Sequence, residues 1–441
     1  MDQNSSFNIN NDIKCVINDI IKNSSITFLE LSETATLDCI LDMCKETLSQ
    51  IYKLDEITLK LISKYCETEL NRLKSLDEIV YSSLVNREDH TRELTKQEKQ
   101  KIIKQIKYLK EQPQYQQKSP EWFAHRLTMV TASNLSAAIG KSKYKSNYNN
   151  LIIRKCGIKM KYISSDATRH GVKYEDVAIM LYEKKNNVCV EEYGCIRHKT
   201  IPYLGASPDG ICGIKSKNQQ IIGRMLEIKC PYSRKITGIP PVGYAIQVQG
   251  QLEVCNLEYC DFLECKISEY DNKDCYFNDI ETEDKGSVIE VYNISKKNPE
   301  FFYSKININK EEYDIWEENI IDKIWDDPNL DYKNTVFWKL EKYSCVLLKR
   351  NREWFNKILP DITNFWNIVQ KYKKTGCDEL LKKKKKKTYE IPTFGFYDGD
   401  NLDTTNENTT SNDKIIIKKK KKKKKKKKDN NGPPKEIKLN I

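Results

Sequence analysis

Apolar and polar residues alternate over a short stretch in the middle of the chain, at residues 225–229 (Met-Leu-Glu-Ile-Lys). Alternate residues of an extended strand point to the same face. The pattern therefore predicts a strand that carries Glu227 and Lys229 on one face and Leu226 and Ile228 on the other.

A second short strand is predicted at residues 203–206, ending at a Ser-Pro-Asp-Gly turn at 207–210. If this strand pairs with residues 225–229 as a hairpin, Asp209 lies beside Glu227. Two neighbouring carboxylates suit Mg²⁺, which takes oxygen ligands and keeps several of its waters. Each motif alone is also common as an ordinary turn or a surface ion pair, so only the combination indicates a metal site.

Helical spacing places a third acid on an apolar face. Glu175, Ile179 and Tyr182 are spaced at i, i+4 and i+7. A buried, unpaired carboxylate is costly, and a metal ion would compensate its charge. The alternative is a glutamate in the first turn of a helix, where the helix dipole stabilises it. Residues 244–252 carry glutamines at every second position, and their periodicity fits a strand or a helix equally well.

Periodicity and composition divide the chain into four predicted parts. These are a helical N-terminal region (1–112), an α/β core (113–270), a C-terminal extension of the core with strands and then helices (271–374), and a disordered lysine-rich tail (375–441). The N-terminal region is expected to contain a helix that Ser32 could cap. The extension is expected to end in two helices separated by Pro360.

The formal net charge of +12 comes from the tail. Lysine runs at 382–387 and 418–428 supply 17 charges, and +12 minus 17 leaves −5 for the rest. DNA binding by the folded part would therefore need a local basic patch, for which the candidates are Lys141, Lys143, Lys145, Arg154, Lys155, Lys159 and Lys161, with Tyr144 and Tyr148 available to stack on bases. A solvated helix face explains the same residues equally well.

Several protein classes are excluded by what the sequence lacks. The 15 cysteines are odd in number and include no C-x-x-C, and the N-terminus is polar, so we expect reduced thiols in a soluble, intracellular protein. The spacing of Cys255, Cys260 and Cys265 does not favour an iron-sulfur cluster. No apolar stretch has the length of a membrane span, and neither a phosphate-binding loop nor paired histidines occur.

A set of short motifs, in this order, resembles the lambda-type exonucleases, also called YqaJ-type viral recombinases. The resemblance covers roughly residues 119–267 and is carried by Trp122, Arg126, Thr131-Ala132-Ser133, His170-Gly171-x-x-x-Glu175, Ser207-Pro208-Asp209-Gly210, Glu227-x-Lys229-Cys230-Pro231 and Gln247-Val248-Gln249. It implies an α/β, restriction-endonuclease-like core of the PD-(D/E)xK superfamily, with a mixed central sheet flanked by helices.

The resemblance also implies a role for individual residues. The metal ligands would be Glu175, Asp209, Glu227 and the backbone carbonyl of Ile228. Lys229 would activate the attacking water, and Gln247 would position it. Arg126 and Ser133 would hold a 5′ phosphate, although Arg126 could instead stack on Trp122 and Ser133 could instead cap a helix.

The function that the resemblance implies is a Mg²⁺-dependent deoxyribonuclease, with Mn²⁺ as a substitute, that digests double-stranded DNA ends from 5′ to 3′ by two-metal hydrolysis. Such an enzyme serves DNA recombination, repair or replication, with a single-strand annealing protein as partner. The relatives form homotrimers, and a viral member would act in the cytoplasm or nucleus of a host cell. Two alternatives stay open: an endonuclease or structure-selective nuclease on the same core, and an inactive DNA-binding recombination scaffold.

Overall fold

The computed structural model describes residues 34–50, 77–85, 92–117, 119–142, 146–160 and 165–382, with ten single residues between positions 16 and 90. Its helices are α2 (Thr34–Ser49), α4 (Glu78–Ser83), α5 (Lys96–Glu111), α6 (Pro120–Leu127), α7 (Leu135–Ala138), α8 (Ser146–Lys155), α9 (Asp166–Asn186), α10 (Val242–Cys255), α11 (Lys273–Asn278), α12 (Lys310–Asp326), α13 (Arg352–Thr375) and α14 (Asp378–Lys382), with the 3₁₀ turns η3 (Ala132–Asn134) and η4 (Gln219–Ile221). Its strands are β1 (Val130–Thr131), β2 (Val190–Glu191), β3 (Ile196–Arg197), β4 (Leu204–Ala206), β5 (Gly210–Cys212), β6 (Met225–Lys229), β7 (Tyr259–Glu269), β8 (Lys285–Asn293), β9 (Asn298–Tyr303) and β10 (Leu330–Lys349).

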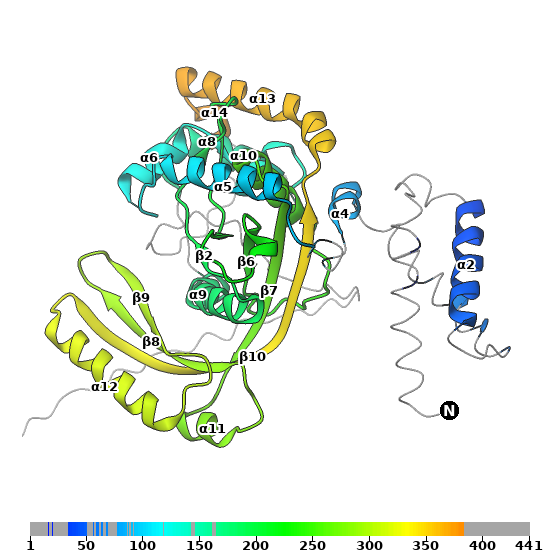
Figure 1. Cartoon of the computed structure of the whole chain (residues 1–441). Helices are drawn as coiled ribbons and strands as arrows, with labels where there is room; N and C mark the ends of the chain where they lie inside the picture. Colours follow the sequence, from blue (N-terminus) through cyan, green and yellow to red (C-terminus); the bar gives the residue numbers. More distant parts are fainter. Residues whose placement is uncertain are drawn as a thin grey trace, which may run out of the picture. The chain divides into compact units, whose positions relative to one another are not determined.

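A seven-stranded sheet forms the centre, in the order β2-β5-β6-β7-β10-β8-β9. Its strands β6 and β7 run parallel, and the other neighbours are antiparallel. The long strand β10 pairs with β7 along one half and with β8 along the other, which joins the core to the β8–β9 hairpin (Figure 1). Strands β1, β4 and β3 form a separate small sheet. The predicted α/β fold with a mixed sheet flanked by helices is confirmed.

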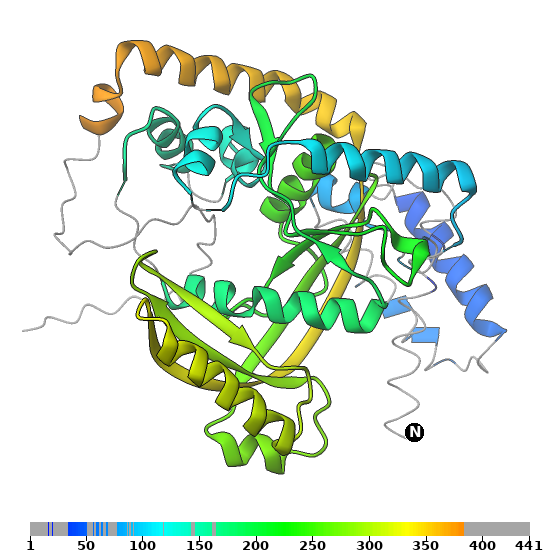
Figure 2. The same ribbon diagram turned by 60° about the vertical axis from the view of Figure 1, so that its left-hand side comes forward.

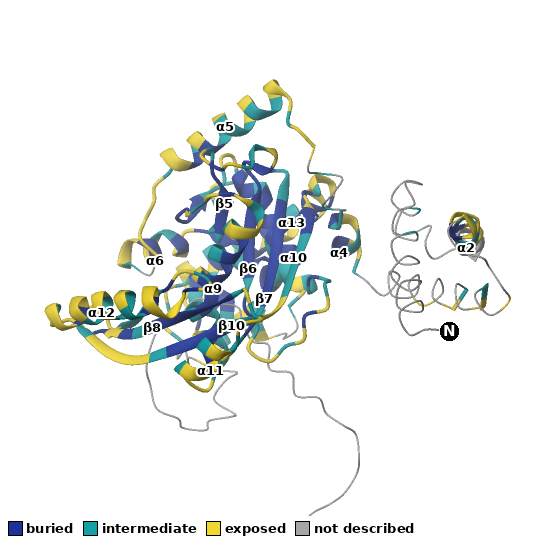
Figure 3. Cartoon of the chain, turned by 60° about the horizontal axis from the view of Figure 1, so that its bottom comes forward, coloured by how far each residue is buried: buried dark blue, intermediate teal, exposed yellow. Residues whose placement is uncertain are grey.

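Helices cover both faces of the central strands (Figure 2). On one face, α10 and α13 share a hydrophobic core with Met225 and Phe262. On the other face, α9 packs on Leu226, Ile228 and Leu263. Strands β6 and β7 are therefore buried between two layers (Figure 3).

The alternating residues of β6 behave as the sequence predicts, but the partner strand differs. β6 pairs with β5, with Gly210 opposite Leu226. The predicted partner at 203–206 is β4, which instead joins β1 and β3 in the small sheet. The expected hairpin between 203–206 and 225–229 is therefore wrong, because the chain crosses from one sheet to the other through the Ser-Pro-Asp-Gly segment.

The C-terminal extension differs from the prediction in the order of its elements. Residues 271–374 alternate between helix and strand, and β10 was not expected. A single helix, α13, runs through Pro360, where two helices were predicted. Helix α14 occupies Asp378–Lys382, within the segment assigned to the tail.

At the N-terminal side, α2 confirms the expected helix, with Ile40, Cys44 and Leu48 buried on one face. Its predicted cap Ser32 and the lysine-rich residues 383–441 lie outside the described residues. Among the helices that the structure describes, none is both long enough and apolar enough to cross a membrane.

Candidate active site

Glu227 is a fully buried carboxylate in the middle of β6, and three side chains donate to it. Lys229 Nζ and Gln247 Nε2 donate to Oε1 at 2.5 and 2.7 Å, and Gln251 Nε2 donates to Oε2 at 2.7 Å. These contacts confirm that Glu227 and Lys229 point to the same face. They also show that α10 is a helix that places two glutamines, one turn apart, against the glutamate.

Lys229 is enclosed by negative charge. Burial opposes its charged form, but Glu227 and Asp209 outweigh burial and raise the pKa of Lys229. The ammonium also lies 5.0 Å from the centre of the Tyr244 ring, within the range of a cation–π contact. Lys229 is therefore a cation in this arrangement, and it acts as a charged hydrogen-bond donor.

Asp209 lies beside β6 at the point where β5 begins. Its Oδ2 accepts a 2.7 Å hydrogen bond from the backbone N–H of Ile228. The carbonyl and N–H of one strand residue point to the same side, so the carbonyl oxygen of Ile228 faces the same edge of β6. Burial and the charges of Glu227 and Glu175 raise the pKa of Asp209 well above its usual range.

Glu175 lies on α9, half-buried, and its charge acts on Asp209. Within the described residues, no three histidine, cysteine, aspartate or glutamate side chains converge closely enough to form a ready-made metal site. The donor types nevertheless fit a hard divalent cation, because the Asp209 and Glu227 carboxylates are close enough for their charges to interact and Asp209 bonds the backbone of Ile228, whose carbonyl oxygen is a further oxygen donor. The raised pKa of Asp209 marks a place where added positive charge is stabilising.

Arg126 is buried at the end of α6. Its guanidinium lies 4.3 Å from the centre of the Trp122 ring, which is the stacking arrangement considered from the sequence. It also donates to the hydroxyls of Ser207 and Thr131, at 3.4 and 3.3 Å. Ser133 contacts Thr131 through their hydroxyls at 3.2 Å, and its side chain caps no helix.

The arginine cluster and the glutamate cluster are joined. Gln251 Nε2 donates both to Glu227 and to the carbonyl oxygen of Ser207, the residue that Arg126 contacts. Sequence reasoning missed Gln251, Ser207 and Tyr244 as site residues. Gln251 lies four residues after Gln247, a spacing that places both on one face of either a helix or a strand, but only a helix turns Gln249 away from them.

The predicted basic patch, which extends from Lys141 to Lys161 around α8, lies only partly within the described residues. Lys155 is buried, and its Nζ donates to the backbone carbonyl of Arg126 at 2.9 Å. Tyr148 packs edge-on against Phe365 of α13. Lys143, Tyr144, Lys145 and Lys161 lie outside the described residues. Lys155 and Tyr148 thus serve the Arg126 cluster and the core, whereas Lys141 and Lys159 are exposed. The basic patch stays a prediction.

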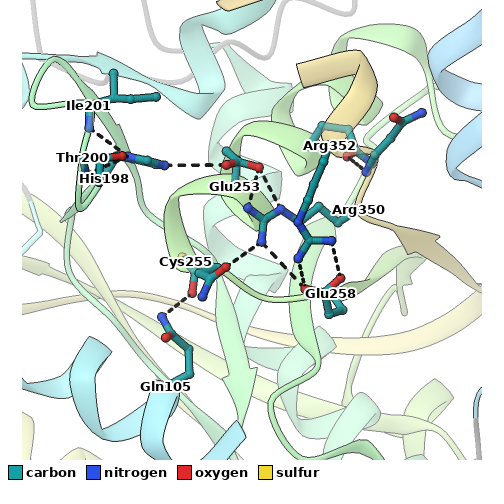
Figure 4. Close-up of polar contacts among 12 residues, drawn as sticks. Gln105, His198, Thr200, Ile201, Glu253, Cys255, Glu258, Arg350 and Arg352 are labelled. Atoms are coloured by element: carbon teal, nitrogen blue, oxygen red, sulfur yellow. Dashed lines mark hydrogen bonds and ion pairs between the residues drawn. The ribbon is translucent and has the colours of Figure 1, made fainter. Parts of the chain in front are cut away.

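An ion-pair network fixes the C-terminal half of α10 (Figure 4). Arg350, just after β10, donates to Glu253 Oε2 at 2.8 Å through Nε and to Asn256 Oδ1 at 2.8 Å. His198 Nδ1 accepts from the backbone N–H of Ile201, so its Nε2 carries the proton and faces Glu253 at 3.8 Å. Two residues before Glu253, Gln251 contacts the candidate catalytic glutamate. The network therefore holds α10 in register with β6.

The three evenly spaced cysteines do not form a cluster. Cys260 and Cys265 lie on β7 at positions of opposite parity, so their side chains point to opposite faces. Cys255, Cys260 and Cys265 are all buried free thiols, and burial raises their pKa values. Their surroundings are those of core residues.

The fold and the site together define a class: a mixed α/β protein with two acids and a lysine at the edge of a central strand. Residues 121–258 match the model of the YqaJ-like viral recombinase domain, and the resemblance seen in the sequence is confirmed.

Among the similar proteins, an uncharacterised protein of Acanthamoeba polyphaga mimivirus is 30% identical over 338 residues, covering 68% of this chain and 61% of that protein. A protein of African swine fever virus is 32% identical over 160 residues, covering 31% of this chain and 46% of that protein. The chain thus spans less than two thirds of either relative.

Two solved structures align over more than half of the chain. The alkaline exonuclease LHK-Exo from Laribacter hongkongensis is 21% identical, with a TM-score of 0.36, covering 60% of this chain and 99% of that one. A phage-related exonuclease from Haemophilus somnus is 14% identical, with a TM-score of 0.31, covering 58% and 96%.

Proposed function

We propose that this chain is a metal-dependent deoxyribonuclease that digests duplex DNA from 5′ ends, with its catalytic centre at Asp209, Glu227 and Lys229. The observation that carries the proposal is the burial of Glu227 beside Asp209, with Lys229 donating to Glu227. Two carboxylates side by side are unfavourable unless positive charge compensates them. The family of the domain and the viral origin of the relatives support a role in viral DNA recombination or repair.

Asp209, Glu227, Glu175 and the carbonyl oxygen of Ile228 would hold Mg²⁺, or Mn²⁺ in its place. Bound there, the ion would supply charge stabilisation to the phosphate and would lower the pKa of a water. Gln247 and Gln251 keep the Glu227 carboxylate in place through one hydrogen bond to each oxygen. Lys229 carries a positive charge that can orient the attacking water and stabilise charge on the phosphate.

The proposed 5′ end site is the cluster of Arg126, Thr131, Ser133 and Ser207. A guanidinium and hydroxyl groups are the donors that phosphates accept. The contact of Gln251 with the carbonyl of Ser207 ties this cluster to the catalytic glutamate. An enzyme built this way cuts at a fixed distance from a DNA end.

Digestion of three matched substrates tests the proposal. We expect Mg²⁺-dependent degradation of a linear duplex with 5′-phosphate ends, slower degradation of the same duplex with 5′-hydroxyl ends, and no cleavage of a covalently closed circle. Arg126→Lys keeps the charge but loses the planar two-pronged donor, so it should remove the preference for the phosphate. Cleavage of the closed circle would contradict an end-dependent enzyme and identify an endonuclease.

A further inference from the structure

Glu264 on β7 is a buried acid on the catalytic face of the sheet. In the parallel pairing of β6 with β7, Glu264 lies opposite Lys229 and Phe262 lies opposite Glu227, so all four side chains share one face. Glu264 is fully buried, and Arg234 Nη2 donates to its Oε1. Its Oε2 has no hydrogen-bond partner among the described residues. A buried carboxylate oxygen without a donor is rare, because its desolvation is not compensated.

Lys229 donates a hydrogen bond to Glu227, the carboxylate that would also bind a divalent cation. Its Nζ donates to Glu227 Oε1, which already accepts from Gln247, while Gln251 holds Oε2. A carboxylate oxygen has two lone pairs, so a cation that binds Oε1 must displace one of its two donors. The glutamine amides are neutral, whereas the ammonium repels a cation at this distance. Lys229 is therefore the donor that leaves.

Across the strand pair, directly opposite Lys229, lies the unpartnered oxygen of Glu264. Paired strands lie about 4.8 Å apart, so a lysine side chain spans the gap without backbone movement. The Tyr244 ring lies along this route: Lys229 Nζ is 5.0 Å from its centre, and the Arg234 guanidinium, already paired with Glu264, is 5.9 Å from it. The aromatic face can keep the ammonium stabilised between the two carboxylates.

We propose that Lys229 changes partner when a divalent cation binds, leaving Glu227 Oε1 and donating to Glu264 Oε2. Glu264 is then the positioning residue of the catalytic lysine. It keeps the ammonium charged and beside the reacting phosphate after Glu227 has become a metal ligand. This inference rests on the proposed nuclease function, since it requires a cation at Glu227.

Calorimetric titration with Mn²⁺ tests the exchange without relying on activity. In the full-length protein, Glu264→Gln should weaken Mn²⁺ binding about tenfold, because the displaced ammonium then meets a neutral amide instead of a carboxylate. In a Lys229→Met background, which has no ammonium to displace, the same substitution should change the affinity less than about twofold. An equal loss in both backgrounds, or no loss in the first, would overturn the partner exchange.

Asp261→Asn is the matched control. Asp261 is also fully buried on β7 and paired with arginine, but it lies at a position of opposite parity and bonds Tyr182 at 2.6 Å and Arg87 at 3.2 Å. Its loss should leave Mn²⁺ affinity unchanged. If it weakens binding as much as Glu264→Gln does, the effect is a general loss of packing and the inference fails.

A crystal structure of the unmutated protein with Mn²⁺ decides the point even if a variant does not fold. We expect Lys229 Nζ within hydrogen-bond distance of Glu264 Oε2. A lysine still bound to Glu227 in the loaded site would refute the exchange. Absence of Mn²⁺ binding by the unmutated protein is a different outcome, because it would contradict the proposed function itself.

Discussion

At the scale of single residues, the three glutamines of α10 contact two different parts of the protein. Gln247 and Gln251 each donate to one oxygen of Glu227. Gln249 points away from that site: it donates to Ser83 and to the carbonyl of Lys349. The pattern of glutamines at every second position is visible in the sequence, but only the helix divides them into two groups.

Paired substitutions on this helix separate catalysis from stability. Gln251→Leu should lower the rate of metal-dependent DNA digestion about 10- to 100-fold, as expected when a hydrogen bond that orients a metal ligand is lost. Gln249→Leu should chiefly lower the free energy of unfolding, because Ser83 and Lys349 lose a buried partner. Steady-state kinetics and urea unfolding of both variants check this division. Equal activity loss in both would contradict it.

His170 gives the protein a pH-dependent stability. The residue is buried, and burial lowers its pKa to about 4 from an ordinary value near 6.5. Above pH 6.5, both the folded and the unfolded state hold it neutral, so it makes no difference. Between pH 6.5 and 4, only the unfolded state takes up the proton, so stability is lost as the pH falls.

The loss attributable to His170 should amount to roughly 3 kcal/mol, at about 1.4 kcal/mol per pH unit. Urea unfolding of the unmutated protein and of His170→Gln, measured from pH 8 to pH 4.5, isolates it. The stability difference between the two should be constant above pH 6.5 and should shift in favour of the variant below. A difference that does not change with pH would show that His170 is not held neutral.

At the scale of secondary-structure elements, the sequence predicts the strands and helices that show a clear local periodicity of apolar residues. β6 follows from its alternation, and Glu175 lies on a helix as its spacing indicates. The pairing of β6 with β5 instead of β4 is set by contacts between segments that are distant in the sequence. Local sequence periodicity does not predict such contacts. The continuous α13 shows the same limit: packing of Ile358 and Ile362 on the core holds the helix together across Pro360.

Two arginine substitutions test whether the ion-pair network of Arg350 and Glu253 holds α10 in place. Arg350→Met should destabilise the protein by about 3 kcal/mol, because it removes one partner of a largely buried ion pair with Glu253. Arg352→Met breaks a pair with Glu258 in which both side chains are exposed, and should cost under about 1 kcal/mol. Thermal unfolding monitored by circular dichroism gives both values. Similar losses would mean that the network does not hold α10.

At the scale of the whole molecule, charge and chemistry are separated along the sequence. Residues 383–441 contain 19 lysines and 8 acidic residues, so their removal lowers the formal charge from +12 to +1. The candidate catalytic residues lie within 175–247, far from this segment in sequence. The basic character of the chain is therefore no evidence for the catalytic site, which rests on the arrangement of its acids, lysine and glutamines.

Truncation after Lys382 tests whether the lysine-rich segment contributes to DNA binding. The cut leaves α14 intact. If the segment neutralises phosphates, the affinity for duplex DNA should depend less steeply on salt concentration in the truncated protein, because fewer counterions are released. Fluorescence anisotropy over a range of salt concentrations measures the slope. An unchanged slope would remove the segment from the DNA-binding account.

Digestion of a 5′-phosphorylated linear duplex by the unmutated protein and by Glu227→Gln, each with Mg²⁺ and with a chelator, tests the central claim most directly. The unmutated protein should shorten the duplex only with Mg²⁺, and the variant should be inactive although folded, because a neutral amide cannot replace the carboxylate as a cation ligand. Undiminished digestion by Glu227→Gln, or digestion by the unmutated protein in the presence of chelator, would contradict the assignment of the site.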